Sequence, residues 1–329
     1  MPELKSKFRP AWWLPGPHLP TIWGKFGRWQ PTVHDRVERA VTPDGDHISL
    51  ARMGVIRPAV PHLLILHGLE GKINAKYAHG MLAEARTRGW SGDLMMFRSC
   101  DGESNNVRRL YHSGETTDID FIVRGLILAH PDLHLLICGV SLGGNVTLKW
   151  LGEQATNLPP QVKRAAAISV PFDLEEGSVF MEHGFSRVYV RHFLQSLREK
   201  TLRKMERYPD LCNRELLMGA RTFRDFDNLV TGPVHGFTDA HDYYTKSSSI
   251  GFIDKIQIDT LLLSAWDDPF LPKRVLERVR NIARANPRLF LEFSERGGHV
   301  GSVEGQPWAQ NYYVEKRAIA WLANEVLHL

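Results

Sequence analysis

A serine flanked by glycines is the first feature of the chain that could do chemistry. Ser141 stands in the run Gly139-Val140-Ser141-Leu142-Gly143, after the apolar stretch Leu133 to Cys138 and before a helical pattern over Leu142 to Glu153. On a tight turn from a strand into a helix, a serine projects its Oγ, and glycines at the neighbouring positions avoid clashes. The bare G-x-S-x-G pattern arises by chance in roughly one chain of this size in ten, so its context decides. That context predicts a nucleophilic serine.

A nucleophilic serine needs two further groups, because its hydroxyl is a poor nucleophile at neutral pH. A histidine must take its proton, and an acid must fix the tautomer of that histidine. His299 stands between glycines, in a loop that follows the last strand-like run. The acid is expected in the turn after the run Asp259 to Ala265, where Asp267 and Asp268 are adjacent. Asp268 is favoured because it precedes Pro272 by four residues, whereas Asp267 would cap the turn; Asp267 remains the alternative.

The reaction also needs donors for the oxyanion of a tetrahedral intermediate. The apolar run Leu63 to Leu66 ends in His67-Gly68-Leu69-Glu70-Gly71. We therefore expect the oxyanion hole to consist of the backbone N–H groups of Leu69 and Leu142. His67 is expected to shape the loop, and proton transfer is its less favoured role. Because this set supplies its own nucleophile and base, neither a metal nor an organic cofactor is expected.

These groups must be carried by a sheet whose strand ends lie together. Strand-like apolar runs occur at His62 to His67, Asp93 to Phe97, Leu133 to Ser141, Arg164 to Val170, Ile258 to Ala265 and Arg288 to Phe293. Helical spacing of apolar residues occurs at Ala75 to Arg88, Thr116 to His130, Leu142 to Glu153, Lys273 to Arg284 and Val314 to Leu327. This alternation predicts an α/β fold with a mostly parallel central sheet covered by helices on both faces. Glu38 to Met53 is expected to form an antiparallel hairpin beside it.

One region interrupts the alternation and divides the chain. Residues 174–250 are helical in pattern and rich in charged and aromatic residues, which predicts an inserted helical cap. We expect an N-terminal extension at 1–37 packed on the core, a core at 38–173 and 251–329, and the cap at 174–250. The cap aromatics expected to wall an acyl pocket, or alternatively to pack the cap itself, are Phe180, Phe185, Tyr189, Phe193 and Phe223. The charged run Arg198 to Arg207 is expected to be a solvated helix face.

Composition excludes several classes of function. The 329 residues carry 41 basic and 37 acidic side chains, a net charge of +4, without a basic block, so no nucleic-acid partner is expected. The three cysteines are widely spaced, which favours a reducing cytoplasm over a disulfide framework or zinc site. Cys138 is expected to be a small buried hydrophobe. No apolar stretch approaches the ~18 residues of a membrane span. The sequence leaves the oligomeric state open.

Two clusters offer weaker alternatives. Trp12, Trp13, Trp23 and Trp29 crowd the N-terminal arm, where we expect them to cover the core or contact a subunit rather than enter a membrane interface. His235, Asp239, His241 and Asp242 could be taken for a metal site, but their spacing does not suit one helix face. A structural, hydrogen-bonded role is favoured for this second cluster.

The combination of motifs resembles the α/β-hydrolases, and among them the YheT-type hydrolases of the fourth α/β-hydrolase-domain family. The matching runs are HGLEG at 67–71, GVSLGGN at 139–145, GGHVG at 297–301, PHLPTIW at 17–23, RSCDG at 98–102 and YHSGET at 111–116. One departure is Ser99, where the family often has glycine. The resemblance implies an α/β-hydrolase fold and carboxylic ester hydrolysis, with some relatives acting on acyl glycerols or phospholipids or in ethyl ester synthesis.

The sequence therefore predicts a serine hydrolase that cleaves small acyl esters through an acyl-enzyme at Ser141. An acyltransferase that passes the acyl group to an alcohol or thiol is the alternative, since the sequence does not fix the acceptor. A binding protein on a hydrolase fold is disfavoured because every catalytic position is filled.

Overall fold

The centre of the protein is a sheet of eight strands. The computed structural model describes residues 3–325. In spatial order the strands are β1 (Arg36–Val41), β2 (His47–Met53), β4 (Ser91–Met95), β3 (Pro61–Leu66), β5 (His134–Val140), β6 (Val162–Ile168), β7 (Thr260–Ala265) and β8 (Leu289–Ser294). β1 and β2 form the predicted antiparallel hairpin, and β2 also pairs antiparallel with β4. The strands from β4 to β8 are parallel, so their carboxyl ends share one edge of the sheet.

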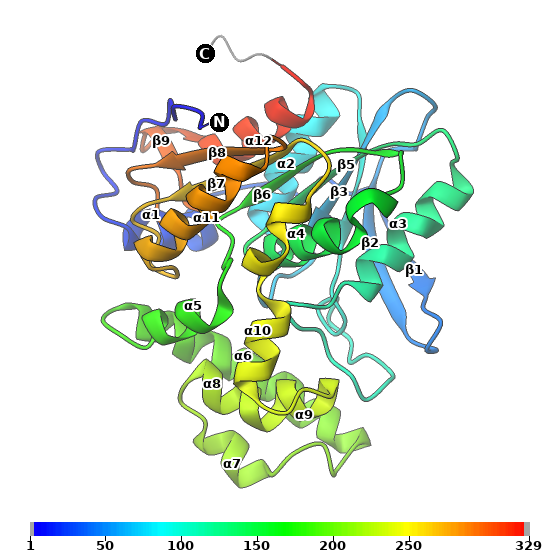
Figure 1. Cartoon of the computed structure of the whole chain (residues 1–329), viewed down its shortest axis with the longest axis vertical. Helices are drawn as coiled ribbons and strands as arrows, with labels where there is room; N and C mark the ends of the chain where they lie inside the picture. Colours follow the sequence, from blue (N-terminus) through cyan, green and yellow to red (C-terminus); the bar gives the residue numbers. More distant parts are fainter. Residues whose placement is uncertain (1–2, 326–329) are drawn as a thin grey trace.

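Helices cover both faces of this sheet (Figure 1). α2 (Lys76–Thr87) packs beside α12 (Tyr313–Leu322), and α12 contacts β6 and β7. α3 (Thr117–Ala129), α4 (Leu142–Gln154) and α11 (Lys273–Ala285) lie on the opposite face. The strands are apolar and buried on both sides, as a sheet between two helical layers requires. The predicted fold class is confirmed.

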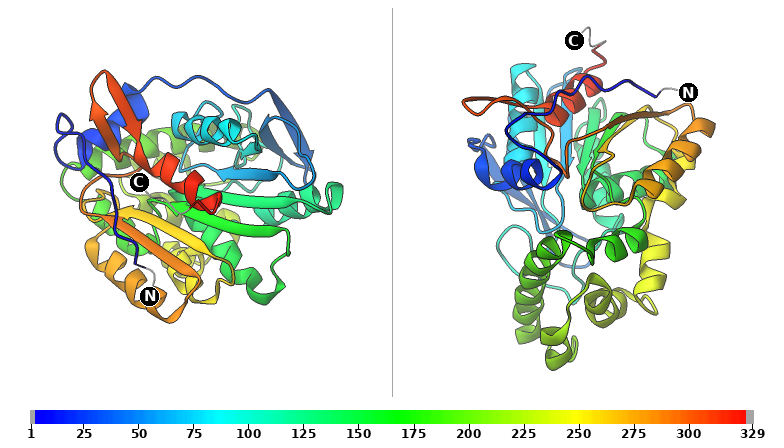
Figure 2. Two further views of the ribbon diagram at one scale, coloured as in Figure 1. Left: turned by 90° about the horizontal axis from the view of Figure 1, so that it is seen from above. Right: turned by 90° about the vertical axis from the view of Figure 1, so that its left-hand side faces the viewer.

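Between β6 and β7 the chain leaves the sheet and forms a group of helices. They are α5 (Leu174–Met181), α6 (Ser186–Arg207), α7 (Arg214–Gly219), α8 (Phe223–Phe226), the π-helical segment η3 (Asp227–Thr231), α9 (Gly232–His235) and α10 (Ala240–Ser247). Figures 1 and 2 show this group at one end of the molecule, away from both termini. It has an apolar cluster of its own, which includes Val190, Leu194, Leu217 and Phe226. The exact boundaries of the three parts predicted from the sequence remain predictions.

The N-terminal arm lies against the end of the core. α1 (His18–Ile22) and the π-helical segment η1 (Trp23–Gly27) follow an irregular stretch. The indole N–H groups of Trp13 and Trp23 donate to the hairpin of β9 (Val303–Gln306) and β10 (Ala309–Tyr312), which Figure 2 shows beside the arm. Trp12 and Trp29 are 72% and 84% exposed.

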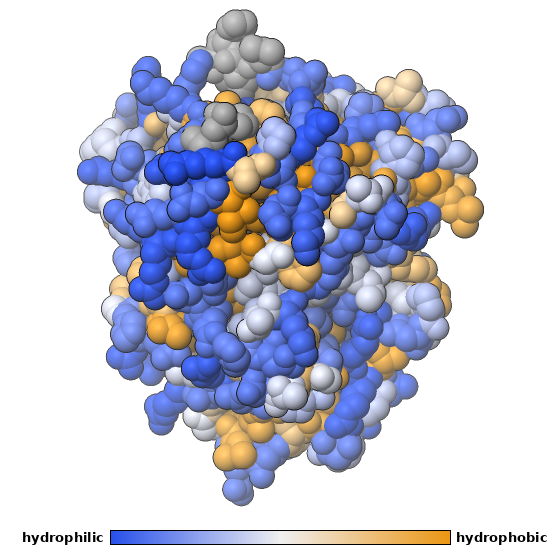
Figure 3. All heavy atoms as spheres, in the orientation of Figure 1, coloured by the Kyte–Doolittle hydropathy of each residue, from blue (hydrophilic) through white to orange (hydrophobic). Residues whose placement is uncertain are grey.

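The first four predicted helices agree with α2, α3, α4 and α11 to within one residue at each end, because their apolar spacing is regular. The last predicted helix ends at Leu322 instead, and residues 326–327 of that prediction lie outside the described residues. The β9–β10 hairpin was not predicted, because its strands are short and polar. On the face shown in Figure 3 the surface is largely hydrophilic, with apolar side chains in small separate patches. None of the helices within residues 3–325 is long and apolar enough to cross a membrane.

Candidate active site

Ser141 lies on a strained turn between β5 and α4. Its backbone has φ 53° and ψ −119°, in the left-handed half of conformational space that residues with a side chain rarely adopt. A Cβ on Gly139 would come 2.4 Å from the carbonyl oxygen of Gly143, and a Cβ on Gly143 would come 2.4 Å from that of Leu66. The turn therefore requires both glycines, and it holds Ser141 at the carboxyl edge of the sheet.

His299 connects this serine to an acid. Its Nε2 lies 2.9 Å from Oγ of Ser141, and its Nδ1 lies 2.9 Å from Oδ2 and 3.1 Å from Oδ1 of Asp268. His299 and Asp268 are both buried. The ring of Phe270 stacks on the imidazole with centroids 3.9 Å apart, and its backbone N–H donates to Asp268. His299 is thus within hydrogen-bonding distance of both other predicted residues.

Asp267 takes a different position. Its Oδ1 accepts a hydrogen bond of 2.9 Å from the backbone N–H of Gly298, and no contact joins it to the imidazole within the described part of the chain. Burial raises the pKa of this carboxyl. Asp267 therefore bonds to the backbone of the loop that carries His299, whereas Asp268 contacts the imidazole ring of His299.

The loop after β3, which carries the second predicted oxyanion amide, packs against the serine. A Cβ on Gly68 would lie 3.1 Å from the Cβ of Ser141, so loop and nucleophile are in close contact. Tyr77 and Tyr111 accept hydrogen bonds from the N–H groups of Gly68 and Glu70, on either side of Leu69. Leu69 N–H itself donates to no group within residues 3–325. Leu142 is the first residue of α4, where an N–H has no partner inside the helix.

The imidazole of His67 is held by hydrogen bonds at the start of the same loop. Its Nδ1 lies 2.7 Å from the carbonyl oxygen of Gly68, and its Nε2 accepts from the N–H of Phe97 at 3.1 Å. Full burial lowers the pKa of the imidazole to about 4, so it is neutral at pH 7. With both nitrogens engaged, His67 has a structural position rather than one from which it could move protons.

Sequence reasoning missed the residues that hold the backbone around His299. The N–H of His299 donates to Oγ1 of Thr21 in α1, and the N–H of Val300 donates to Oγ of Ser169 after β6. A Cβ on Gly298 would collide with the carbonyl oxygen of Pro17 at 2.3 Å. The PHLPTIW run of the arm therefore packs on the histidine loop. In the sequence, the only indication of this packing was that the PHLPTIW run belongs to the motifs that resemble the family.

Helix α6 contacts the loops of the core through two lysines. Lys200 Nζ lies 2.6 Å from Oε1 of Glu70, and Lys204 Nζ lies 2.7 Å from Oδ1 of Asn105. The prediction that this run is a solvated face is wrong at these two positions, because Lys200 is 7% and Lys204 is 1% exposed. Both lie on the side of α6 that faces the core, where loop oxygens satisfy their charges.

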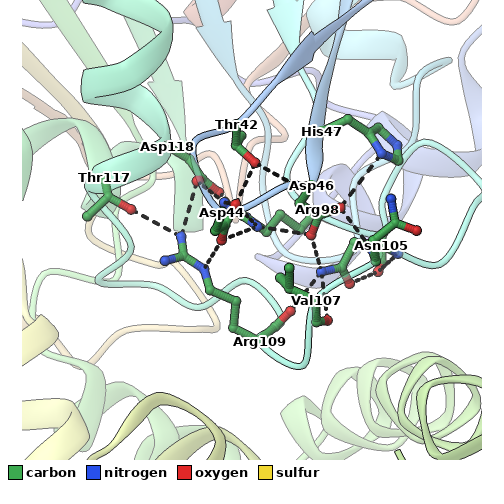
Figure 4. A network of polar contacts seen from close by, with 12 residues as sticks. Thr42, Asp44, Asp46, His47, Arg98, Asn105, Val107, Arg109, Thr117 and Asp118 are labelled. Atoms are coloured by element: carbon green, nitrogen blue, oxygen red, sulfur yellow. Dashed lines mark hydrogen bonds and ion pairs between the residues drawn. The ribbon is translucent and has the colours of Figure 1, made fainter. Parts of the chain in front are cut away.

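Asn105 belongs to a buried polar network centred on Arg98 (Figure 4). The guanidinium of Arg98 donates to Asp46 at 2.9 Å and to Asp118 at 2.7 Å, which joins the β1–β2 turn to α3. Ser99, the departure from the family pattern, has φ 60°, a conformation that favours glycine. Its hydroxyl donates to Asn105 Oδ1 at 2.6 Å, and this bond offsets part of the backbone strain. The loop therefore keeps the glycine-like conformation.

A cavity of about 140 Å³ extends from Ser141 between the core and the cap. We call it the inner cavity. Its walls are mostly apolar and include Leu142, Met181, Leu197, Phe223 and Phe226. The prediction that Phe180 and Phe185 wall an acyl pocket is wrong, since neither lines this cavity and they are 38% and 47% exposed.

A second, larger cavity of about 590 Å³ opens on the other side of Ser141. This outer cavity lies between the N-terminal arm, the start of α2 and helix α6, and its lining includes Lys25, Tyr189 and His192. Leu69, Ser141, Phe193 and Phe270 line both cavities, so the two meet at the serine. His299 lines only the outer cavity, and Leu142 lines only the inner one.

The histidines and aspartates near the end of the cap do not gather at one point. The ring of His235 lies against that of His112, with centroids 4.5 Å apart and the planes tilted by 56°, whereas His241 contacts Glu175. Asp239 accepts from the N–H of Asp242 at the start of α10. Within residues 3–325, no group of three or more histidine, cysteine, aspartate or glutamate side chains has an arrangement that could hold a metal ion.

The fold and the Ser141, His299 and Asp268 geometry are those of an α/β hydrolase, and the chain belongs to this family: the family described as "alpha/beta hydrolase fold" matches residues 61–306. Within this family, the chain is similar to the YheT-type hydrolases. "Putative esterase YheT" of Escherichia coli is 38% identical, over 93% of this chain and 89% of its own length. The monoacylglycerol lipase of Saccharomyces cerevisiae is 31% identical over 74% of this chain and 55% of its own. Mouse phospholipase ABHD3 is 27% identical over 92% and 75%.

Solved structures agree on the fold. The Pyrococcus furiosus esterase Pf2001 superposes with a TM-score of 0.58, covering 91% of this chain and 94% of its own, at 15% sequence identity. An acylaminoacyl peptidase from Pyrococcus horikoshii reaches 0.56 at 14% identity, covering 91% and 42%. At such low identities the likeness concerns the fold alone.

Proposed function

We propose that the protein is a serine hydrolase that cleaves carboxylic esters through an acyl-enzyme on Ser141. The observation that carries the proposal is the contact of His299 with Ser141 through Nε2 and with Asp268 through Nδ1, each at 2.9 Å. This is the arrangement in which an imidazole can take a proton from the serine while the acid fixes its tautomer.

Each step of the reaction then has its group. Ser141 Oγ attacks the ester carbon as His299 Nε2 takes its proton, and the N–H groups of Leu69 and Leu142 stabilise the oxyanion. Collapse of the intermediate breaks the bond to the alcohol, which leaves with the proton from His299. Water then attacks the acyl-enzyme, with His299 acting first as base and then as acid, and the carboxylic acid leaves.

The acyl-enzyme could also be resolved by an alcohol or thiol, which would make the protein an acyltransferase. The relatives named as a lipase and a phospholipase support acyl glycerols as a substrate class. We also propose that the protein works in the cytoplasm, which the three free cysteines support.

A fluorophosphonate probe and a panel of 4-nitrophenyl esters from acetate to palmitate test the proposal. We expect the probe to label the parent protein and not Ser141→Ala, and at least one ester to be turned over. Product analysis with added 1-butanol separates the two outcomes, since a transferase forms butyl ester in excess of free acid. Absence of both labelling and turnover in the folded protein would overturn the proposal.

A further inference from the structure

The proposed reaction, on which this inference rests, fixes where the ester lies. It determines on which side of Ser141 the acyl half and the alcohol half must be. The leaving oxygen must lie beside His299 Nε2, because that atom supplies its proton. His299 lines only the outer cavity. The oxyanion points to the amides of Leu69 and Leu142, so the acyl chain is left with the inner, apolar cavity. The outer cavity is therefore the place of the alcohol.

The lining of the outer cavity has an unbalanced positive charge. Lys25 and Lys76 are its charged side chains other than the histidines, and within the described residues no aspartate or glutamate lines it. Lys76 is occupied, since its Nζ donates to the carbonyl oxygen of Arg28 and to that of Phe26. Lys25 Nζ has only the ring nitrogen of His192 at 2.9 Å, and no carboxylate of residues 3–325 is within ion-pair distance of it.

The neighbouring charges do not neutralise Lys25. Burial and the positive charge of Lys72 lower the pKa of Lys25, and Glu70 opposes them. The carboxylate of Glu70, however, is already bonded to Lys200, Tyr111 and Ser196. The Asp268 carboxylate is buried behind the imidazole of His299. A cationic donor thus remains in the lining of the cavity, and no carboxylate of residues 3–325 forms an ion pair with it.

The local backbone directs this lysine towards the cavity. Lys25 lies in η1, a π-helical segment of the arm, and π-helical turns are common at functional sites. Gly24, Lys25 and Phe26 of this segment all line the outer cavity. The Lys25 ammonium also lies 5.6 Å from the ring centroid of Phe193, which lines both cavities.

We propose that the outer cavity binds an alcohol that carries an anionic group, a phosphate or a carboxylate, and that Lys25 is the residue that selects it. The chemistry of recognition is a charge-assisted hydrogen bond from the Lys25 ammonium to an anionic oxygen, in place of or beside its bond to His192. Lys25 is a specificity residue and takes no part in breaking the ester bond.

Matched pairs of esters test this subsite. The first pair is 4-nitrophenyl butyrate and 3-carboxy-4-nitrophenyl butyrate, and the second is 1-butyrylglycerol and its 3-phosphate. The parent protein should show a higher kcat/KM for the anionic member of at least one pair, and the pair identifies whether carboxylate or phosphate is preferred. In Lys25→Gln we expect that preference to fall about tenfold, as for loss of one partly screened charged hydrogen bond.

Two controls keep the result specific to the site. Lys25→Arg should retain the preference, and Lys273→Gln, which removes an exposed lysine that lines neither cavity, should leave it as in the parent. Raising NaCl from about 50 to 500 mM should weaken the preference in the parent and not in Lys25→Gln. Equal rates for both members of both pairs, or equal effects of the Lys25 and Lys273 variants, would overturn the proposal.

A binding measurement separates this proposal from the proposed function. Calorimetric titration of Ser141→Ala with glycerol 3-phosphate and with glycerol needs no turnover. Stronger binding of the phosphate, lost when Lys25→Gln is added, would support the subsite even if no ester were cleaved. Equal binding of the two compounds together with normal hydrolysis of neutral esters would refute the subsite and leave the hydrolase intact.

Discussion

The ammonium of Lys200 in the cap lies 2.6 Å from the carboxylate of Glu70 in the loop that carries Leu69. Both side chains are buried, and Tyr111 donates to the same carboxylate oxygen at 2.6 Å. Burial alone would raise the pKa of Glu70, but the charge of Lys200 and these hydrogen bonds hold it below its usual value. The ion pair therefore joins the position of helix α6 to the conformation of the proposed oxyanion loop.

Lys200→Met should lower kcat for 4-nitrophenyl acetate by about tenfold with little change in KM, because a misplaced Leu69 amide weakens transition-state binding more than substrate binding. Since removing one partner of a buried pair destabilises a fold, the double variant Lys200→Met/Glu70→Gln should regain stability to urea without regaining kcat. Lys204→Met is the matched control, because Lys204 contacts the Asn105 loop instead. Parent kcat in folded Lys200→Met would contradict a positioning role.

Ser141→Ala should reduce ester hydrolysis by about 10⁶-fold, since loss of the nucleophile in a serine triad removes most of the rate and leaves only the oxyanion and binding contributions. The variant should remain folded, because a smaller side chain is accommodated at the same turn. Circular dichroism and steady-state turnover measure the two effects. Turnover near the parent rate would assign the nucleophile elsewhere.

Asp268→Asn should lower kcat by roughly 10⁴-fold, because an amide in contact with Nδ1 favours the wrong tautomer of His299. Asp267→Asn should cost far less, because Asp267 bonds to the Gly298 N–H and not to the ring. Turnover of one ester by both variants decides between them. The reverse ranking would transfer the role of the acid to Asp267.

A local sequence pattern encodes some features of this site and not others. Strand ends and glycine-bounded turns place Ser141, Asp268 and His299 because each motif directly follows a buried strand. Lys200 and Thr21 were not found, because a lysine in a charged run and a threonine in a proline-rich arm have nothing local that marks them as buried or bonded. Their positions depend on contacts across the chain, with Glu70 and the His299 backbone. The same limit explains why Phe180 and Phe185 were placed in a wall they do not form.

Acid should destabilise the protein through His67. Burial lowers its pKa to about 4 from 6.5, so the folded state binds fewer protons than the unfolded state between these values. The contribution of His67 to the free energy of unfolding should therefore be constant above about pH 6.5 and fall by about 1.4 kcal/mol per pH unit as pH drops from 6.5 towards 4.

Urea unfolding at pH 7.5 and pH 5 measures this dependence. His67→Gln should show a smaller loss on acidification than the parent, although it is less stable at both pH values. His241→Gln, which replaces a largely exposed histidine, is the control and should behave as the parent. An equal pH dependence in His67→Gln and the parent would show that His67 does not contribute.

The inner cavity should set the acyl chain length that the protein prefers. Phe223 lines this cavity, and Phe223→Ala should create room for additional methylenes. Each further buried methylene is worth about 0.8 kcal/mol, or about fourfold in kcat/KM, so the optimum of the 4-nitrophenyl ester panel should move to longer chains. Phe185→Ala is the matched control, because Phe185 is half exposed and lines neither cavity, and its profile should equal that of the parent. If both variants keep the parent optimum while folded, Phe223 only packs the cap and the acyl chain lies elsewhere.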